Sequence, residues 1–133
     1  MNVIPFLTYE DARAALDWLT EAFGFERTQV HEGEDGTIVH AEMRFADGMI
    51  MLGSAGENNL GMKTARELGA VNEGVYSIVD HGLDAHYEQA VAAGAEIVLP
   101  LHDTDYGSRE YVVRDPEGNL WSFGTYRPEL PAE

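Results

Sequence analysis

Cysteine is absent from the 133 residues of the chain. This excludes disulfide bonds, thiolate metal sites and a cysteine nucleophile, and it suits a reducing compartment. The first residues, MNVIPFLTYEDARAA, contain neither a basic segment nor an apolar run of the length found in signal peptides. No hydrophobic run approaches the length of a transmembrane helix. We therefore expect a cytoplasmic protein that does not enter a membrane.

Positive charge is also scarce. Eight lysines and arginines stand against 24 aspartates and glutamates, which gives a formal net charge of −16. Nucleic acids and anionic membranes need a basic surface, so neither is an expected partner. The acidity favours one of two interpretations: it attracts a cationic ligand, or it simply keeps the protein in solution.

Strand and helix patterns alternate in the same order in the two halves of the chain. In the first half, a strand at 2–9 and a helix at 11–23 precede strands at 25–31, 37–45 and 49–54. In the second half, a strand at 74–80 and a helix at 83–93 precede strands at 96–102, 106–114 and 119–126. Between the halves, residues 55–73 contain three glycines and no strand pattern, with a helical turn expected near Lys63 to Leu68.

This repeat of about 70 residues predicts an α+β fold built from two βαβββ modules. The hydrophobic fraction of 44% and the length are typical of one globular domain over residues 1–133. We expect module 1 at about 2–54, a linker at 55–73 and module 2 at about 74–126. Each four-stranded mixed sheet would carry a helix on one face and curl its other face around a cleft.

The closing hairpin, YVVRDPEGNLWSFGTY, places a tight turn between two strands. Asp115, Pro116 and Gly118 suit a turn with a left-handed glycine. In the second strand Trp121 and Phe123 point to one face, which predicts a core position for both. Ser122 points to the opposite face, so its surroundings bear on function.

Three segments resemble the vicinal oxygen chelate superfamily, which includes glyoxalase I, extradiol dioxygenases and the fosfomycin- and bleomycin-resistance proteins. They are DARAALDWLTEAFGF, VYSIVDHGLDAHYEQAVAAGAEI and YGSREYVVRDPEGNLWSFGTY. The resemblance spans nearly the whole chain and implies paired βαβββ modules, usually in a homodimer. It also implies a cleft formed across modules or chains.

Enzymes of that superfamily hold a divalent metal through His, Glu or Gln side chains on the first and last strands of each module. The resemblance places these positions at Ile4, at Met51 (or Leu52 with a bulge), at Gly74 and at Ser122. None of these side chains is a credible ligand for such an ion, and Glu73, beside the third position, would be alone. We therefore expect no metal and no cofactor.

Strand alternation predicts that the cleft face is mostly apolar and aromatic, with a few polar groups. Tyr106 and Arg109 would lie near its mouth, where Arg109 could pair with an acidic ligand group or with neighbouring residues. The residues expected to contact a ligand are Ile4, Phe6, His40, Glu42, Met51, Tyr76, Tyr106, Arg109 and Ser122. Met49 and Ile78 are expected on the same face.

His40 and Glu42 alternate on one strand and should share a face. Two interpretations stay open: a polar outer edge with a salt bridge to Arg44, or polar anchors in the cleft. His31, His81 and His86 are expected to face solvent. No histidine pair has the spacing of a helical metal site.

Three hypotheses on function follow. The first is a metal-free protein of the bleomycin-resistance type that sequesters a hydrophobic or cationic small molecule without chemistry. The second is a glyoxalase-like lyase, isomerase or epimerase that uses a non-standard site such as His40 and Glu42. The third is a regulatory or partner-binding module that makes its contacts through residues 55–73.

Overall fold

The computed structural model describes residues 2–56 and 60–132. Strands and helices follow the expected alternation. Their bounds are β1 Phe6–Tyr9, α1 Ala12–Phe23, β2 Glu26–Glu32, β3 Ile38–Phe45, β4 Gly48–Ser54, α2 Ala65–Leu68, β5 Gly74–Ile78, α3 Leu83–Ala92, β6 Glu96–Asp103, β7 Arg109–Arg114 and β8 Leu120–Gly124. We refer to β1, α1 and β2 to β4 as module 1 and to β5, α3 and β6 to β8 as module 2. The short helix α2 lies in the expected linker, of which residues 57–59 are outside the described part.

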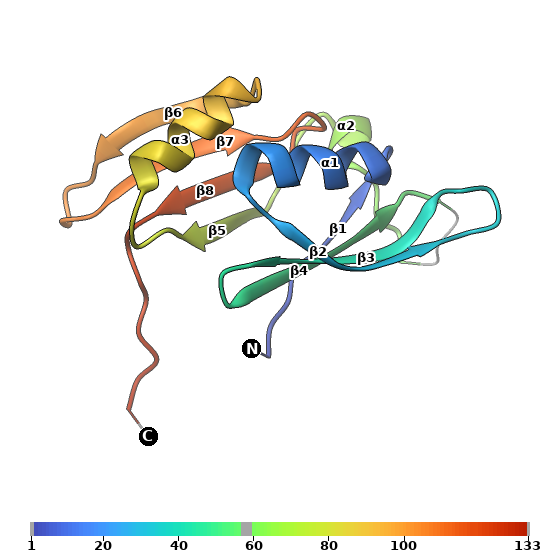
Figure 1. The fold of residues 1–133 in the computed structure, drawn as a ribbon, viewed down its shortest axis with the longest axis horizontal. Coiled ribbons are helices and arrows are strands. Elements are labelled where there is room, and N and C mark those ends of the chain that lie inside the picture. Colours follow the sequence, from blue (N-terminus) through green and yellow to red (C-terminus); the bar gives the residue numbers. More distant parts are fainter. Residues whose placement is uncertain (1, 57–59, 133) are drawn as a thin grey trace.

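Each module forms its own four-stranded mixed sheet (Figure 1). The strand order is β1-β4-β3-β2 in module 1 and β5-β8-β7-β6 in module 2. The first strand of each module runs parallel to the last, and the other neighbours are antiparallel. The predicted α+β fold of two βαβββ modules is confirmed, and neither sheet closes into a barrel.

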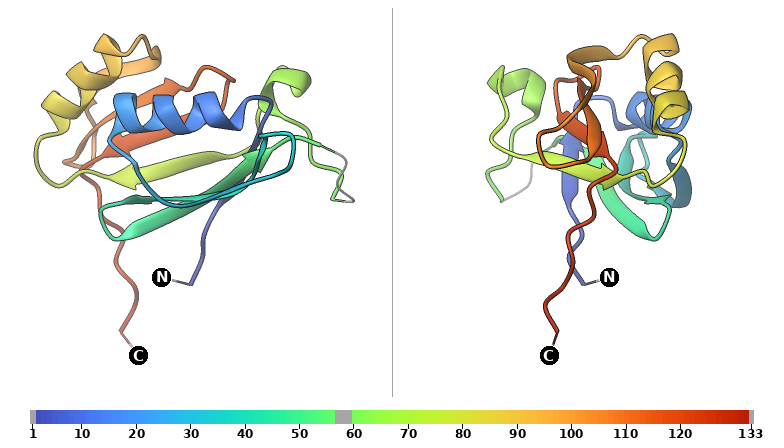
Figure 2. Two further views of the ribbon diagram at one scale, coloured as in Figure 1. Left: turned by 45° about the vertical axis from the view of Figure 1, so that its right-hand side comes forward. Right: turned by 90° about the vertical axis from the view of Figure 1, so that its left-hand side faces the viewer.

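The two long helices lie side by side on the same side of the sheets (Figure 2). Asp11 begins α1 by accepting a hydrogen bond from the backbone N–H of Ala14 at 3.0 Å. Gly24 ends this helix in the left-handed conformation, with φ of 81°. Because both helices cover the same side, the opposite face of each sheet is left open.

Aromatic side chains from both modules form a shared core beneath the helices. The ring of Phe23, at the end of α1, lies 5.5 Å from Trp121 and 4.6 Å from Phe123, measured between centroids. Phe25 also contacts Trp121 at 5.5 Å. Trp121 and Phe123 are fully buried, as the alternation of the closing hairpin predicted. The modules are therefore joined by packing as well as by the linker.

The turn between β7 and β8 makes a second connection between the modules. The buried Asp115 carboxylate accepts hydrogen bonds from the Tyr9 hydroxyl at 2.7 Å and from Trp121 Nε1 at 3.1 Å. The Glu117 carboxylate accepts from the backbone N–H groups of Glu10 and Asp11, at 2.7 and 2.9 Å. A turn of module 2 thus holds the start of the first helix of module 1.

Several strands are shorter than the sequence predicts: β5 ends at Ile78 rather than at residue 80, β8 spans Leu120–Gly124 rather than 119–126, and the first and seventh strands begin late. The first begins at Phe6 rather than at residue 2, because Pro5 has no N–H for a ladder, although its carbonyl accepts from Met51 N at 3.0 Å. The seventh begins at Arg109 rather than at residue 106. There Thr104 and Ser108 close a turn through four hydrogen-bond contacts that involve their hydroxyl and backbone groups.

Candidate functional site

The open face of module 1 carries a row of side chains that crosses all four strands. Phe6 on β1 pairs with Met51 on β4, Met51 with Glu42 on β3, and Glu42 with Gln29 on β2. Partners in such a row point to the same face. The expectation that Phe6, Glu42 and Met51 share a face is therefore borne out by the strand register.

A hollow of about 330 Å³ lies over this open face. Its walls come from β1, β3, β4 and two apolar residues of the linker. The lining residues are Phe6, Leu7, Thr8, Val39, His40, Met51, Leu52, Gly53, Ser54, Leu60 and Met62. Neither lysine nor arginine is among them. We call this cavity the module 1 hollow.

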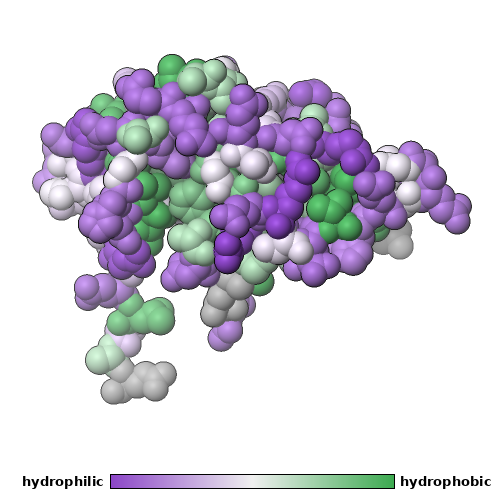
Figure 3. Space-filling view, in the orientation of Figure 1, coloured by the Kyte–Doolittle hydropathy of each residue, from purple (hydrophilic) through white to green (hydrophobic). Residues whose placement is uncertain are grey.

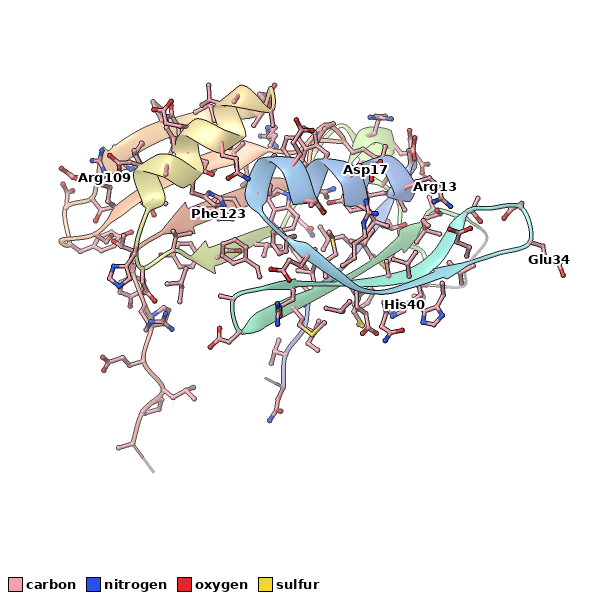
Figure 4. All side chains as sticks on the ribbon, viewed as in Figure 1. Arg13, Asp17, Glu34, His40, Arg109 and Phe123 are labelled. Carbon is pink, nitrogen blue, oxygen red and sulfur yellow. The ribbon has the colours of Figure 1, made fainter. Side chains whose placement is uncertain are left out.

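His40 and Glu42 form a hydrogen-bonded pair at the edge of the module 1 hollow. Their Nε2 and Oε2 atoms are 2.9 Å apart, and the side chains are 39% and 32% exposed. An ionised carboxylate only accepts, so Nε2 donates to it and Nδ1 of the neutral ring is an acceptor. Arg44 takes no part, since it pairs with Glu26 at 2.8 Å. Figure 4 shows His40 on the side of the sheet away from α1.

The open face of module 2 holds Tyr76 opposite Ser122. The Tyr76 hydroxyl donates to the carbonyl of Tyr126 at 2.7 Å. Burial, and then the nearby Glu110 carboxylate, raise the pKa of Tyr76 above its ordinary value. Glu110 also lies 3.5 Å from His102 across β6 and β7. This face therefore has its own set of polar groups.

Gly124 makes room for that arrangement. A Cβ atom there would lie 2.8 Å from the Tyr76 hydroxyl oxygen and 3.0 Å from Cβ of Glu110. The absence of a side chain at residue 124 thus lets the tyrosine lie across β8.

Tyr76 lines a second hollow, of about 260 Å³, rather than the one beside His40. This hollow lies between the two modules and also contacts Pro5, Met49, Val75 and Ile78. The structure thus divides the expected cleft residues. Phe6, His40 and Met51 line one cavity, whereas Met49, Tyr76 and Ile78 line another.

The remaining expected contact residues line neither hollow. Ser122 is on the open face of module 2, and Ile4 precedes β1. Tyr106 is 64% exposed in the β6–β7 turn, with its ring 5.8 Å from that of Tyr126. Arg109 pairs with Asp84 of α3 at 3.1 Å and with Asp103 at 2.9 Å, so its charge is already neutralised (Figure 4).

The prediction that His86 faces solvent is wrong. Its ring is partly buried among Phe23, Tyr111 and Phe123. Nε2 donates to the carbonyl of Phe23 at 2.8 Å, and Nδ1 accepts from the Tyr111 hydroxyl at 2.7 Å. Burial lowers the pKa of His86 below its ordinary value. The expected exposure of His31 and His81 is borne out.

The four positions that the superfamily uses for metal ligands offer no suitable donor set in this chain. Leu52, the alternative for the second position, points into the core, which leaves Met51 on the open face. Ile4 and Gly74 have no donor atom in their side chains, and the Ser122 hydroxyl is a weak ligand. Within residues 2–56 and 60–132, no three His, Asp or Glu side chains converge as a metal site. A divalent metal therefore does not fit these positions.

Sequence reasoning missed two features of this region. Leu60 and Met62 line the module 1 hollow, and the signal was two large apolar residues within the first part of the linker, LGM. His102 and Glu110 pair across strands, which single-strand alternation does not reveal.

Hydrophilic residues cover most of the face seen in Figure 3, with hydrophobic residues in separate patches. In the described part of the chain, no helix combines the length and the apolar character that crossing a bilayer requires.

Two mixed sheets, each with one covered and one open face, define a protein of the paired βαβββ class. The chain belongs to the Glyoxalase/Bleomycin resistance protein/Dioxygenase superfamily, which it matches over residues 4–123. The resemblance inferred from the sequence motifs is thereby confirmed.

Individual relatives agree with this assignment. The chain is 34% identical over 122 residues to the uncharacterized protein Rv0887c of Mycobacterium tuberculosis, covering 90% of this chain and 71% of that protein. Among solved structures, TioX from Micromonospora sp. ML1 is 35% identical with a TM-score of 0.77, covering 93% of this chain and 97% of TioX. The fosfomycin resistance protein FosX from Mesorhizobium loti is 10% identical with a TM-score of 0.66, covering 96% and 92%. The likeness to FosX concerns the fold alone.

Proposed function

We propose that this protein binds a small, largely apolar molecule in the module 1 hollow and holds it without a metal ion. The observation that carries the proposal is the lining, in which Phe6, Met51, Leu60 and Met62 supply apolar surface beside a few polar groups. One of these polar groups is His40, which is hydrogen-bonded to Glu42. Apolar cavities with few polar groups are the usual form of a small-molecule site. The cysteine-free composition favours the cytoplasm as the place of action.

The absence of metal-ligating side chains at the four superfamily positions favours binding over metal-assisted chemistry. Met51 and Ser122 stand where the enzymes of the superfamily carry His, Glu or Gln, so this chain has little with which to polarise a substrate through a metal. Elemental analysis of the purified protein by plasma mass spectrometry tests this part. One equivalent of zinc, manganese, nickel or iron per chain would contradict it.

Titration with Nile red, a neutral apolar dye, tests the site itself. We expect saturable binding and an affinity about 5- to 30-fold lower for Phe6→Ser, because losing a phenyl contact costs about 1–2 kcal/mol. Val98→Ser is the matched control, since Val98 is an exposed apolar residue of β6. Equal affinity in wild type and Phe6→Ser would overturn the proposed site.

A second candidate function is a lyase, isomerase or epimerase in which His40 acts as a general base oriented by Glu42. The 2.9 Å pair favours it, because a carboxylate on Nε2 leaves Nδ1 free to take a proton. The test is a His40→Ala variant assayed with a substrate found by screening. Unchanged turnover would remove His40 from the mechanism.

In the expected homodimer, the second chain would cover part of the open faces of the sheets. Phe6, Val39 and Tyr76 leave apolar surface accessible in the single chain. Light scattering coupled to size-exclusion chromatography measures the mass, and we expect twice the 14.7 kDa of the chain. The regulatory hypothesis predicts instead a co-purifying partner whose binding is lost when Leu60 and Met62 are changed to serine.

A further inference from the structure

The protein has almost no cationic side chain left with which to bind an anion. All seven arginines of the sequence form ion pairs with carboxylates. The pairs join Arg13 to Glu32, Arg27 to Asp17, Arg44 to Glu26, Arg66 to Glu10, Arg109 to Asp84 and Asp103, Arg114 to Glu96 and Arg127 to Asp80. Lys63 is the eighth cationic residue, and it does not line the module 1 hollow.

The His40–Glu42 pair at the edge of the module 1 hollow offers, in contrast, hydrogen-bond acceptors. Oε2 of Glu42 binds His40, and no other described side chain lies within hydrogen-bond distance of this carboxylate. Nδ1 of the neutral His40 ring likewise has no partner among the described residues. His40 itself lines the cavity, and Glu42 brings a carboxylate to its edge.

The strand register places an apolar platform next to these acceptors. Phe6, Met51 and Glu42 occupy successive strands in one row, so Phe6 and Glu42 are separated by two interstrand spacings, or about 10 Å. Phe6 is 56% exposed, so its side chain is accessible to a ligand. An aromatic ring attracts a cation as well as an apolar group.

We propose that the His40–Glu42 pair selects ligands in which a protonated amine is attached to a flat apolar body. The ammonium group donates to Nδ1 of His40 and is attracted by Glu42, while the apolar body lies on Met51 and Phe6. This inference rests on the proposed function, since it assigns the ligand class of the same hollow. The net charge of −16 adds a long-range attraction for the same class of ligand.

The test compares three compounds that share a naphthalene ring and differ in the charge and chemistry of one polar substituent: 1-naphthylmethylamine, 1-naphthylmethanol and 1-naphthoate. Affinities are measured by fluorescence titration at pH 8 and low salt, where the amine is cationic and the naphthoate anionic. For the wild-type protein we expect the amine to bind at least tenfold more tightly than the alcohol, and the naphthoate most weakly.

Glu42→Gln keeps an acceptor for His40 and removes the charge. We expect it to bring the amine and the alcohol to within about twofold of each other. Glu21→Gln is the matched control, because Glu21 is an exposed residue of α1 and its loss changes the net charge equally. The control should keep the tenfold preference.

The possible outcomes distinguish the selection of cationic ligands from the proposed binding of apolar molecules. Equal binding of amine and alcohol by the wild type, or an unchanged preference in Glu42→Gln, overturns the selection of cations while the apolar site stands. If none of the three compounds binds, the proposed function fails and the ligand class with it.

Discussion

A single residue contributes strongly to the stability of this chain where it accepts hydrogen bonds from several buried donors at once. The Asp115 carboxylate receives four hydrogen bonds, from the side chains of Tyr9 and Trp121 and from the backbone of Glu117 and Asn119. Burial and the negative charge of Asp115 raise the pKa of Tyr9 well above its ordinary value, so the phenol stays a donor. A turn residue that the sequence marks only as a β-turn position is thus a central acceptor of the core.

Asp115→Asn should lower the free energy of unfolding by about 2–4 kcal/mol. The amide presents an N–H group to donors that are already buried, and an unsatisfied buried group costs about 1–3 kcal/mol. Urea denaturation followed by tryptophan fluorescence measures the change. Asp105→Asn, at an exposed loop position, serves as the control and should change stability by less than about 0.5 kcal/mol. Similar effects of both substitutions would contradict this role of Asp115.

His86 should make the folded state sensitive to mild acid. Its folded-state pKa is lowered by burial, so below about pH 6.5 the unfolded chain binds a proton that the folded protein resists. The contribution of His86 is therefore present above that pH and is lost as the pH falls toward its folded-state pKa. Denaturation midpoints between pH 7.5 and 5 should decline less steeply for His86→Gln than for wild type. The exposed His81→Gln should follow the wild-type curve; parallel curves for all three proteins would refute the argument.

The sequence was most informative about the helices and strands. Apolar spacing in α1 and alternation in β8 predict their helix and strand correctly, because each pattern reports burial on one face. The start of β1 and the length of the β6–β7 turn depend on hydrogen bonds between distant residues or on proline, so the predicted bounds were too long there. The division of the cleft residues between two hollows depends on how the modules pack, which no single-strand pattern contains.

Gly53 marks a close approach between two strands of module 1. A Cβ atom there would lie 2.7 Å from the backbone carbonyl oxygen of Val39, and a backbone atom moves only with its strand. Gly53→Ala should therefore destabilise the protein by about 1–3 kcal/mol, the usual cost of overpacking. It should also weaken Nile red binding, since Gly53 forms part of the module 1 hollow.

Gly56→Ala provides the comparison for Gly53→Ala, because a Cβ atom at Gly56 would meet, within 4 Å, no atom of the residues that the structure describes. Its melting temperature and its dye binding should match those of the wild type. A loss in Gly56→Ala as large as that in Gly53→Ala would show that glycine itself, rather than the contact with Val39, is required in this segment.

At the scale of the whole molecule, repulsion between carboxylates opposes compactness. The eight cationic residues leave 16 of the 24 acidic charges unbalanced, and the arginine pairs are exposed. Exposed pairs contribute at most about 1 kcal/mol each, whereas the excess negative charge acts across the entire surface. The net charge follows directly from the sequence. That every arginine forms an ion pair does not, because the ion pairs depend on the fold.

Raising sodium chloride from 20 to 500 mM should therefore raise the melting temperature, because salt shortens the Debye length to a few ångströms and screens the repulsion. Differential scanning fluorimetry measures this directly. A lower melting temperature in high salt would mean that the arginine pairs outweigh the repulsion. Potassium chloride should act like sodium chloride, since screening depends on ionic strength.

The contact of Glu117 with the start of α1 also constrains the order in which the chain can fold as it is made. The N–H groups of Glu10 and Asp11 find their acceptor more than 100 residues later, in the β7–β8 turn of module 2. The first helix of the nascent chain consequently begins without its native acceptor until this turn has been synthesised. Module 1 therefore reaches its final form only after module 2 has been made, and a chain released before β8 would expose the core residues that Trp121 and Phe123 cover.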